Sequence, residues 1–239
     1  MLAIFKREMR SYFTTSIGYI FLASALAIAA IIFSVSTVLS ETADASVYFS
    51  GLIFVLMIFL PILTMKSFSE EKRTKTEQLL LTAPVSTTQM VLGKFFSSFT
   101  MLVIFLVLSS IFFIPLSSYV AEGASGANTA LVMGNMMALL LVGMCFIAIG
   151  LLVSSLTENQ FAAIVITVVA LLLLFLINLF NGFIEVYAIR VVLDWLSIYA
   201  RYDKFTYGIF DIGALIYYIS ITGVFLFLTV RVFEARKYN

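Results

Sequence analysis

Six long windows without a charged residue restrict what this chain can fold into. They cover residues 11–40, 45–65, 95–121, 123–157, 159–184 and 212–230. Each window holds roughly the 20 apolar residues with which a helix crosses a bilayer. Membrane strands would instead alternate apolar and polar residues, and no such alternation appears. The sequence therefore predicts an all-α membrane protein with six transmembrane helices, at about 16–39, 47–65, 90–116, 130–153, 161–180 and 211–230.

Composition supports a single membrane domain over residues 1–239. Charged residues make up 11% of the chain and hydrophobic residues 62%, whereas soluble domains are about 25% charged. The first apolar window is longer than the core of a signal peptide, which has about 7 to 15 residues. We therefore expect a retained first span and a multi-pass protein of the cytoplasmic (inner) membrane.

The distribution of basic residues predicts the orientation. If the N-terminus is cytoplasmic, eleven of the fourteen Lys and Arg fall on the cytoplasmic side, as the positive-inside rule favours. The other three, Arg190, Arg201 and Lys204, lie in one long outer connection, where this rule is weaker. Both termini are therefore placed in the cytoplasm. The net charge of +1 gives no indication of a nucleic-acid partner.

The N-terminal residues 1–13 combine an apolar stripe with basic neighbours. The stripe consists of Leu2, Phe5, Met9, Tyr12 and Phe13. This pattern predicts an interfacial helix on the inner leaflet, where basic residues meet anionic lipid. The alternative is a positive flank that only orients the first span.

The outer connection 181–210 is rich in aromatic and charged residues. Trp195, Tyr199 and Tyr202 are spaced i, i+4, i+7, which places them on one helical face at the outer interface. We expect one or two short external helices here.

The segment 66–89 is the most charged stretch between the spans. It contains the sequence S-E-E-K-R-T-K-T-E-Q-L-L-L-T-A-P-V-S over residues 69–86. We expect an amphipathic helix that stops near Pro84, with Glu71 and Lys75 paired at i, i+4. Ser86 and Gln89 then form a capping box for the next helix. The alternative is an ordinary charged cytoplasmic loop.

Several further positions carry local predictions. Pro61 predicts a kink or early stop in the second span, and the third span should end near Pro115. Thr157 and Gln160 form a second capping box after the fourth span. The glycines of the fourth span predict close helix packing; they are Gly134, Gly143 and Gly150. Asn135 and Asn178 are expected to form hydrogen bonds between helices rather than to bind substrate.

The sequence excludes several kinds of chemistry. It has no histidine, so a His-based triad and His metal ligation are ruled out. Cys145 is the one cysteine, which leaves no intrachain disulfide and no cysteine metal site. There is no Walker A motif. The spans hold no ionisable residue away from their ends, which argues against a proton-coupled carrier. Such a protein needs either a downhill substrate or an external motor.

The segment 67–86 resembles the cytoplasmic loop of ABC-2-type transporter permeases. The shared features are the acidic pair, the T-E-x-L-L core and the A-P-V-S stop. The fragments K-R-E-M-R near the N-terminus and L-L-V-S-S-L-T-E-N-Q-F-A-A after the fourth span support the match in register. The chain is most similar to permeases of gliding-motility-associated ABC transporters and their relatives in nitrous-oxide-reductase maturation.

This resemblance implies a permease without its own ATPase site and without a cofactor in this chain. ATP and Mg would be bound by a cytoplasmic ABC ATPase subunit, present in two copies. Further partners would be a second permease chain, identical or homologous, membrane lipid and auxiliary subunits. Carried over by position, the coupling helix would contact the ATPase through Glu70, Glu71, Lys72, Arg73, Thr76 and Glu77. A second contact would involve Thr157, Glu158 and Asn159. No substrate ligand is identified.

Other function classes stay open at this point. A secondary carrier or channel would work without an ATPase. A permease-like subunit that transmits force or signals without moving solute would have the same sequence features. An intramembrane enzyme is disfavoured because no catalytic constellation is present.

Overall fold

The computed structural model of the chain describes residues 1–39, 46–76, 86–113, 129–181, 186–206 and 211–238. These residues are helical, and no strand occurs among them. The elements are α1 (Leu2–Thr14), α2 (Ser16–Phe33), the π-helical turn η1 (Ser34–Val38), α3 (Ser46–Arg73), α5 (Thr87–Ser110), α7 (Thr129–Leu156), α8 (Gln160–Asn181), α9 (Tyr187–Leu196), α10 (Ile198–Thr206) and α11 (Ile212–Tyr238).

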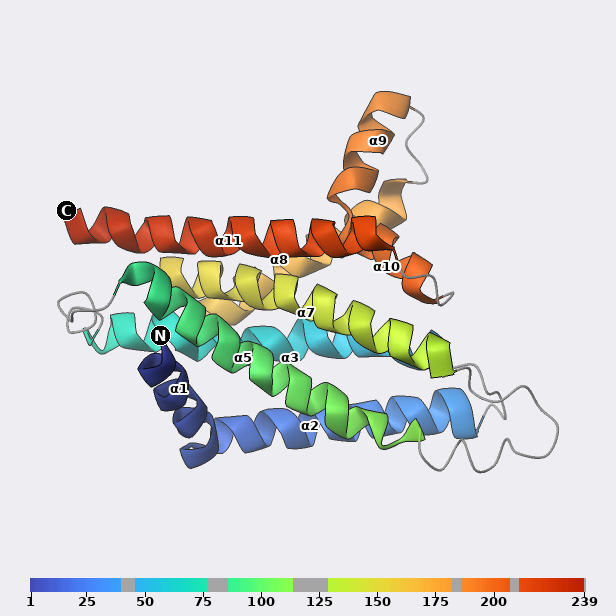
Figure 1. The fold of residues 1–239 in the computed structure, drawn as a ribbon, viewed down its shortest axis with the longest axis horizontal. Helices are drawn as coiled ribbons and strands as arrows, with labels where there is room; N and C mark the ends of the chain where they lie inside the picture. The colour runs from blue at the N-terminus through green and yellow to red at the C-terminus, as the bar shows by residue number, and fades with distance from the viewer. Residues whose placement is uncertain (40–45, 77–85, 114–128, 182–185, 207–210, 239) are drawn as a thin grey trace.

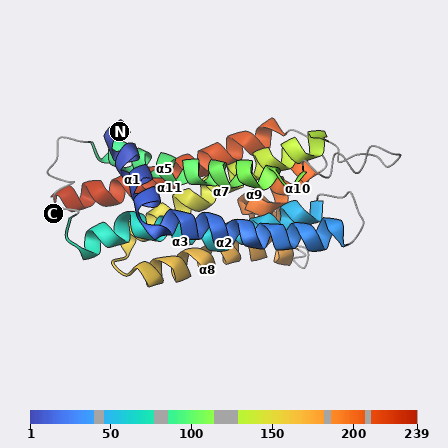
Figure 2. The same cartoon turned by 90° about the horizontal axis from the view of Figure 1, so that it is seen from below.

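Six of these helices form an elongated bundle, which confirms the predicted architecture (Figures 1 and 2). α2, α3, α5, α7, α8 and α11 are long and apolar enough to cross a membrane. The two termini lie at the same end of the bundle, and α9 and α10 lie at the opposite end. Since the basic residues place both termini in the cytoplasm, we refer to the end with the termini as the cytoplasmic end.

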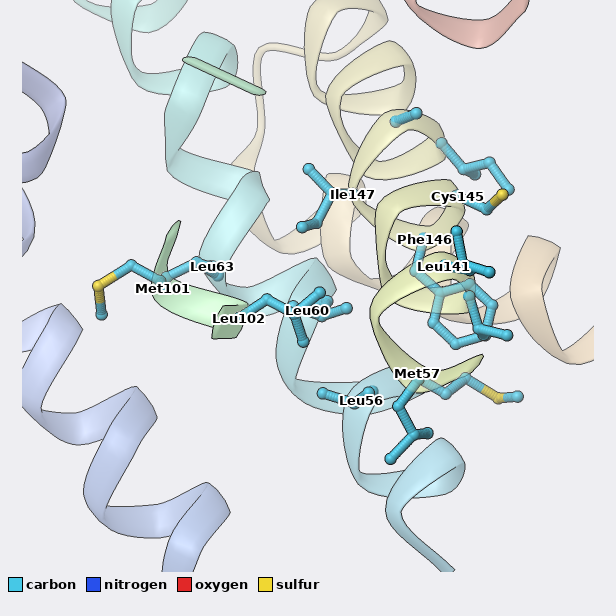
Figure 3. Close-up of a cluster of buried hydrophobic side chains, with 14 of the residues drawn as sticks. Leu56, Met57, Leu60, Leu63, Met101, Leu102, Leu141, Cys145, Phe146 and Ile147 are labelled. Atoms are coloured by element: carbon cyan, nitrogen blue, oxygen red, sulfur yellow. The ribbon is translucent and has the colours of Figure 1, made fainter. Parts of the chain in front are cut away.

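The core of the bundle is built by α3, α5 and α7. More than half of the apolar stretch of each of these helices is buried, against less than a third for α2, α8 and α11. Figure 3 shows Leu60, Leu102 and Ile147 from the three central helices meeting in this core, and all three are fully buried. The outer helices therefore present apolar side chains at the surface, as expected where lipid replaces water.

Two glycines of α7 allow its close packing, as predicted. A Cβ atom at Gly150 would clash with Thr64 of α3, whose own Cβ would lie 3.1 Å away. A Cβ atom at Gly143 would meet the side chain of Leu102 on α5. α7 therefore touches both central partners through positions without a side chain.

The predicted early stop at Pro61 is wrong, because α3 continues through this proline to Arg73. In a lipid-embedded bundle, leaving the helix would expose more unpaired backbone groups than the proline itself removes. The second span and the first part of the charged segment are therefore one continuous helix.

The predicted helix to Pro84, with its Glu71–Lys75 pair, is also wrong. α3 ends at Arg73, and Lys75 adopts a left-handed backbone conformation with φ of 58°. At this helix end the hydroxyl and the backbone N–H of Thr74 both donate to the carbonyl of Glu70, at 2.8 and 2.9 Å. Residues 77–85, including Pro84, lie outside the described residues.

α5 begins as the sequence predicts. The Ser86 side chain accepts a hydrogen bond from the Gln89 backbone N–H at 3.3 Å, the N-cap half of the predicted capping box. The helix ends at Ser110, before Pro115, which lies outside the described residues.

Two short helices, α9 and α10, confirm the expected external elements, but the aromatic residues do not share one face. Ser197 is extended and separates Trp195 on α9 from Tyr199 and Tyr202 on α10. Trp195 is exposed, whereas Tyr202 is buried. The chain breaks there because the Ser197 hydroxyl caps α10 by accepting from the Ala200 N–H at 3.1 Å.

The predicted interhelical role of Asn135 is confirmed. Its Oδ1 accepts a hydrogen bond from the Tyr202 hydroxyl at 3.0 Å, which ties α10 to α7. The hydroxyl of Tyr218 on α11 donates to the Ile198 carbonyl at 2.7 Å and holds α10 from a second helix. The side chain of Asn178 lies outside the described residues.

The N-terminal helix α1 is a separate element that lies across the bundle at the cytoplasmic end (Figure 1). Ile4 and Tyr12 are its buried residues, and the Tyr12 hydroxyl is 3.0 Å from Ser98 Oγ on α5. Leu2 and Phe13 of the predicted stripe are exposed. This placement fits the predicted interfacial helix, with one face on the protein and apolar residues left for the membrane surface.

Candidate functional site

The two predicted ATPase-contacting segments lie side by side at the cytoplasmic end. One is the end of α3, and the other is the turn between α7 and α8. Lys72 Nζ forms an ion pair with Glu158 Oε1 at 3.2 Å, and Ser69 Oγ lies 3.3 Å from Thr157 Oγ1. Segments more than 80 residues apart in the sequence therefore form one surface.

The predicted contact residues differ in how accessible they are. Arg73, Thr76, Glu158 and Asn159 are exposed. Glu70, Lys72 and Thr157 are half-buried, and Glu70 is paired with Lys66 at 3.3 Å. Glu77 lies outside the described residues.

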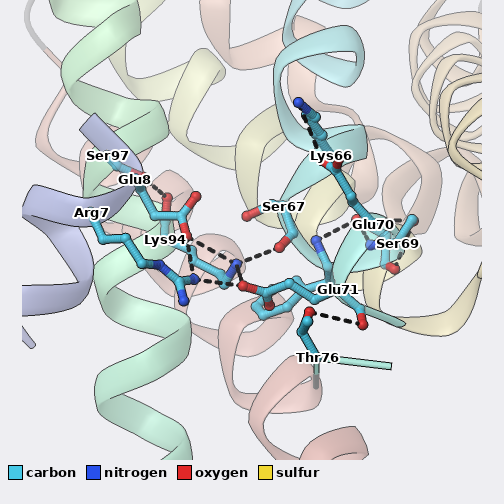
Figure 4. Close-up of polar contacts among 12 residues, drawn as sticks. Arg7, Glu8, Lys66, Ser67, Ser69, Glu70, Glu71, Thr76, Lys94 and Ser97 are labelled. Atoms are coloured by element: carbon cyan, nitrogen blue, oxygen red, sulfur yellow. Dashed lines mark hydrogen bonds and ion pairs between the residues drawn. The ribbon is translucent and has the colours of Figure 1, made fainter. Parts of the chain in front are cut away.

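Glu71 belongs to a charge cluster of four residues, Arg7, Glu8, Glu71 and Lys94 (Figure 4). Glu71 Oε1 is 2.6 Å from Arg7 Nη2 and 2.9 Å from Lys94 Nζ. Glu8 Oε1 is 2.7 Å from Arg7 Nη2 and 3.2 Å from Lys94 Nζ. The cluster contains two cations and two anions, so its net charge is zero. It joins α1, α3 and α5.

Lys94 is the deepest member of the charge cluster. Its side chain is 1% exposed, and Nζ also donates to the Ser67 carbonyl and stands 4.8 Å from the centre of the Phe68 ring. A buried ammonium needs this many partners because its loss of hydration is costly. Lys94 lies near the start of the predicted third span, as expected for a charged residue, but its burial was not predicted.

The charge cluster alters the acidity of its members on α1. Burial alone would raise the pKa of Glu8, but the charges and hydrogen bonds of Lys94 and Arg7 outweigh it and lower this pKa below 4.5. Burial alone would lower the pKa of Arg7, and the contacts with Glu8 and Glu71 raise it instead. Glu8 and Arg7 are therefore both ionised at neutral pH.

Ser154 of α7 contacts the backbone of α3 directly. Its Oγ accepts from the N–H groups of Phe68 and Ser69, both at 3.1 Å, and donates to the Met65 carbonyl at 3.0 Å. The Ser69 hydroxyl returns a bond to the Ser154 carbonyl at 3.0 Å. α3 and α7 are thus joined by a buried polar contact at the start of the charged segment.

The capping box predicted for Thr157 and Gln160 is wrong. The Thr157 hydroxyl is directed back toward α7, where it donates to the Val153 carbonyl at 3.1 Å. Asn159 caps α8 instead, because its Oδ1 accepts from the Phe161 N–H at 2.9 Å.

A family model described as "ABC-2 family transporter protein" matches residues 62–237, well over half of the chain. The chain belongs to the ABC-2 transporter family. Membership makes it a membrane permease of an ABC transporter and implies association with an ABC ATPase. The match starts within α3 and ends within α11, so both segments of the cytoplasmic surface fall inside it. A search of curated proteins finds no match.

Sequence reasoning missed several residues that shape this end of the ABC-2 permease. Arg236 of α11 donates to the Ser155 carbonyl at 2.6 Å, and the ring of Phe233 lies 4.7 Å from that of Phe68. The C-terminal helix therefore also packs against the α3–α7 contact. For Lys94 a signal exists, because a lysine surrounded by apolar residues inside a predicted span requires partners.

A cavity of about 410 Å³ separates α1 from the end of α3 in the ABC-2 permease. Both charged residues and hydroxyls line it, including Arg7, Lys66, Glu70, Glu71 and Lys94. Ser67 Oγ also lines it and is buried with no hydrogen-bond partner among the described residues. In the described part of the chain no three His, Cys, Asp or Glu side chains form a group that could hold a metal ion.

Proposed function

We propose that this ABC-2 permease is the membrane subunit of an exporter that is driven by a separate ATPase. Two copies of the ATPase would bind at the cytoplasmic end and act on a pair of permease chains, identical or homologous. By sequence resemblance the chain falls in the branch that serves gliding motility or nitrous-oxide-reductase maturation. Substrate would move from the cytoplasmic side outwards.

The observation that carries this proposal is the joining of the α3 end to the α7–α8 turn. The Lys72–Glu158 ion pair and the Ser69–Thr157 contact make one surface from the two segments that the family resemblance assigns to ATPase contact. An ATPase bound to this surface would displace both segments together. The family relation alone does not require them to touch.

The exposed residues define the part of the surface that the ATPase would meet. They are Arg73, Thr76, Glu158 and Asn159. Glu71 has a different place, because Arg7 and Lys94 already engage its carboxylate. We assign Glu71 to holding the surface in place and the exposed residues to recognition.

The energy for transport would come from outside this chain. The sequence has no Walker A motif, so ATP and Mg are assigned to the ATPase and no cofactor to the permease. ATP binding and hydrolysis would change the equilibrium between two arrangements of the spans, and substrate would be moved because the two arrangements bind it differently.

Co-purification tests the proposal. An ABC ATPase from the same genome is co-expressed with the permease, and the amount retained on the permease is measured. The double variant Arg73→Glu with Glu158→Arg should lose the ATPase, because both exposed charges are reversed. Arg190→Glu, an exposed charge reversal at the opposite end, is the matched control and should retain it. Equal retention by all three proteins would refute the assignment, as would solute transport by the permease alone in ATP-free liposomes.

A further inference from the structure

The Ser154 hydroxyl bridges two backbone groups of α3 that bond to each other in a regular helix. In an α-helix the N–H of Ser69 donates to the carbonyl of Met65, four residues earlier. Here Ser154 Oγ accepts from the Ser69 N–H at 3.1 Å and donates to the Met65 carbonyl at 3.0 Å. Ser154 of α7 therefore bonds to both groups of this helical step, where the transmembrane part of α3 continues into the charged segment.

Lys94 of α5 contacts the same turn of α3, which we call the junction turn and define as residues 65–71. Its Nζ donates to the Ser67 carbonyl and pairs with Glu71 at 2.9 Å. Ser154 and Lys94 are both buried, at 0% and 1% exposure. Two helices of the core therefore hold the backbone of the junction turn by polar contacts, which in a membrane bundle hold helices together.

We propose that Ser154 and Lys94 are positioning residues that clamp the junction turn to α7 and α5. The turn lies between the transmembrane part of α3 and the residues assigned to ATPase contact. A displacement of residues 73–76 is then carried into α5 and α7 and is not absorbed by bending of α3. This inference rests on the proposed function, because the ATPase supplies the displacement.

Amide hydrogen exchange of the permease without the ATPase tests the clamp itself. Ser154→Ala removes the bridging hydroxyl and should accelerate exchange in residues 65–73 by roughly three- to tenfold, the range for loss of an interhelical hydrogen bond. Ser155→Ala is the matched control, since Ser155 is equally buried and its hydroxyl donates within α7 to Leu152 at 2.6 Å. It should leave this exchange unchanged. Unchanged exchange in Ser154→Ala, or equal acceleration in the control, would overturn the clamp.

A second variant tests the contact that Lys94 of α5 makes with the junction turn. Lys94→Met is combined with Glu8→Gln, so that the charge cluster stays neutral and keeps its Arg7–Glu71 pair. This variant should show the same local acceleration in residues 65–73. If exchange rises throughout α3, α5 and α7 even though the cluster stays neutral, Lys94 stabilises the whole bundle by more than charge balance and is not a positioning residue.

Transmission is measured in the complex with the ATPase. Spin labels replace Ile111 at the end of α5 and Met133 near the start of α7, both exposed at the outer end. ATP should shift the distance between the labels in the wild-type background, and Ser154→Ala should lose at least half of this shift while retaining the ATPase. An undiminished shift would overturn the clamp. Failure of the wild-type permease to bind any ATPase would contradict the proposed function instead, and the exchange data would still decide the clamp.

Discussion

Lys94 Nζ and Glu71 Oε1 lie 2.9 Å apart, and the lysine side chain is 1% exposed. This ion pair connects α5 to the end of α3, the helix that leaves the membrane and carries the predicted ATPase contacts. With Arg7 and Glu8 it forms a neutral cluster that also fixes α1. The cytoplasmic end is therefore a single packed unit, although its parts come from three separate regions of the sequence.

Removing the lysine charge should strongly destabilise the protein. Lys94→Met leaves two carboxylates facing Arg7 alone, and breaking a buried ion pair in this way costs about 3–5 kcal/mol. Lys66→Met is the control, because its pair with Glu70 is partly exposed and such pairs contribute at most about 1 kcal/mol. Unfolding in detergent measures both. Similar losses for the two variants would show that Lys94 contributes no more to the free energy of unfolding than a partly exposed ion pair does.

The lowered pKa of Glu8 predicts a dependence of stability on pH. A carboxyl group with a lowered pKa in the folded state stabilises the protein above its unfolded pKa, here near 4.5, and this contribution is lost as pH falls through the lower folded value. The melting temperature of the wild type should therefore fall steeply below about pH 4.5. Glu8→Gln should be less stable at pH 7 and show a shallower fall. Glu234→Gln, on the cytoplasmic part of α11, should follow the wild-type curve; a wild-type slope in Glu8→Gln would contradict the account.

The contact between α3 and α7 should not tolerate a methyl group at Gly150. Gly150→Ala places a Cβ against Thr64, whose β-branched side chain has few other rotamers in a helix. We expect a loss of about 1–3 kcal/mol, as for overpacked cores. Gly223→Ala in α11 is the control, since nothing lies within 4 Å of the added atom; it should be neutral or stabilising. Thermal unfolding distinguishes the two, and equal stability of both variants would mean that the helices separate easily.

Charge reversal tests whether the Lys72–Glu158 pair matters to the ATPase. Lys72→Glu faces Glu158 with a like charge and should weaken ATPase retention. Stability should change by less than about 1 kcal/mol, because Glu158 is exposed and Lys72 is only half-buried. Lys72→Glu combined with Glu158→Lys restores opposite charges and should recover at least half of the lost retention. A double variant as weak as the sum of the singles would show that the residues act separately.

The sequence predicts the spans well because each one is a local property. A window such as residues 11–40 has a single stable solution in lipid, a helix that satisfies its own backbone. The N-cap at Ser86 and the hydrogen bond of Asn135 follow from equally local chemistry. Pro61 is misleading because a proline usually ends a helix where water can bond to the freed backbone groups. In lipid these groups would stay unpaired, so the helix continues.

The cytoplasmic end is harder to predict because its contacts are distant in sequence. Glu8, Glu71 and Lys94 meet only after α1, α3 and α5 have packed, and no spacing pattern links them. The i, i+4 spacing predicts an ion pair of Glu71 with Lys75. Instead, α3 ends at Arg73, and the Glu71 carboxylate pairs with the buried Lys94. Thr157 likewise bonds backward to Val153, leaving Asn159 to cap the next helix.

Site-specific crosslinking tests whether the ATPase binds the surface formed by the end of α3 and the α7–α8 turn. Thr76→Cys and Glu158→Cys place thiols on the cytoplasmic surface, and Arg190→Cys places one at the opposite end; the native Cys145 is buried. We expect the first two to crosslink to the co-expressed ATPase and Arg190→Cys not to do so. A crosslink from Arg190→Cys, or none from the two cytoplasmic positions in a complex that co-purifies, would contradict this placement of the ATPase.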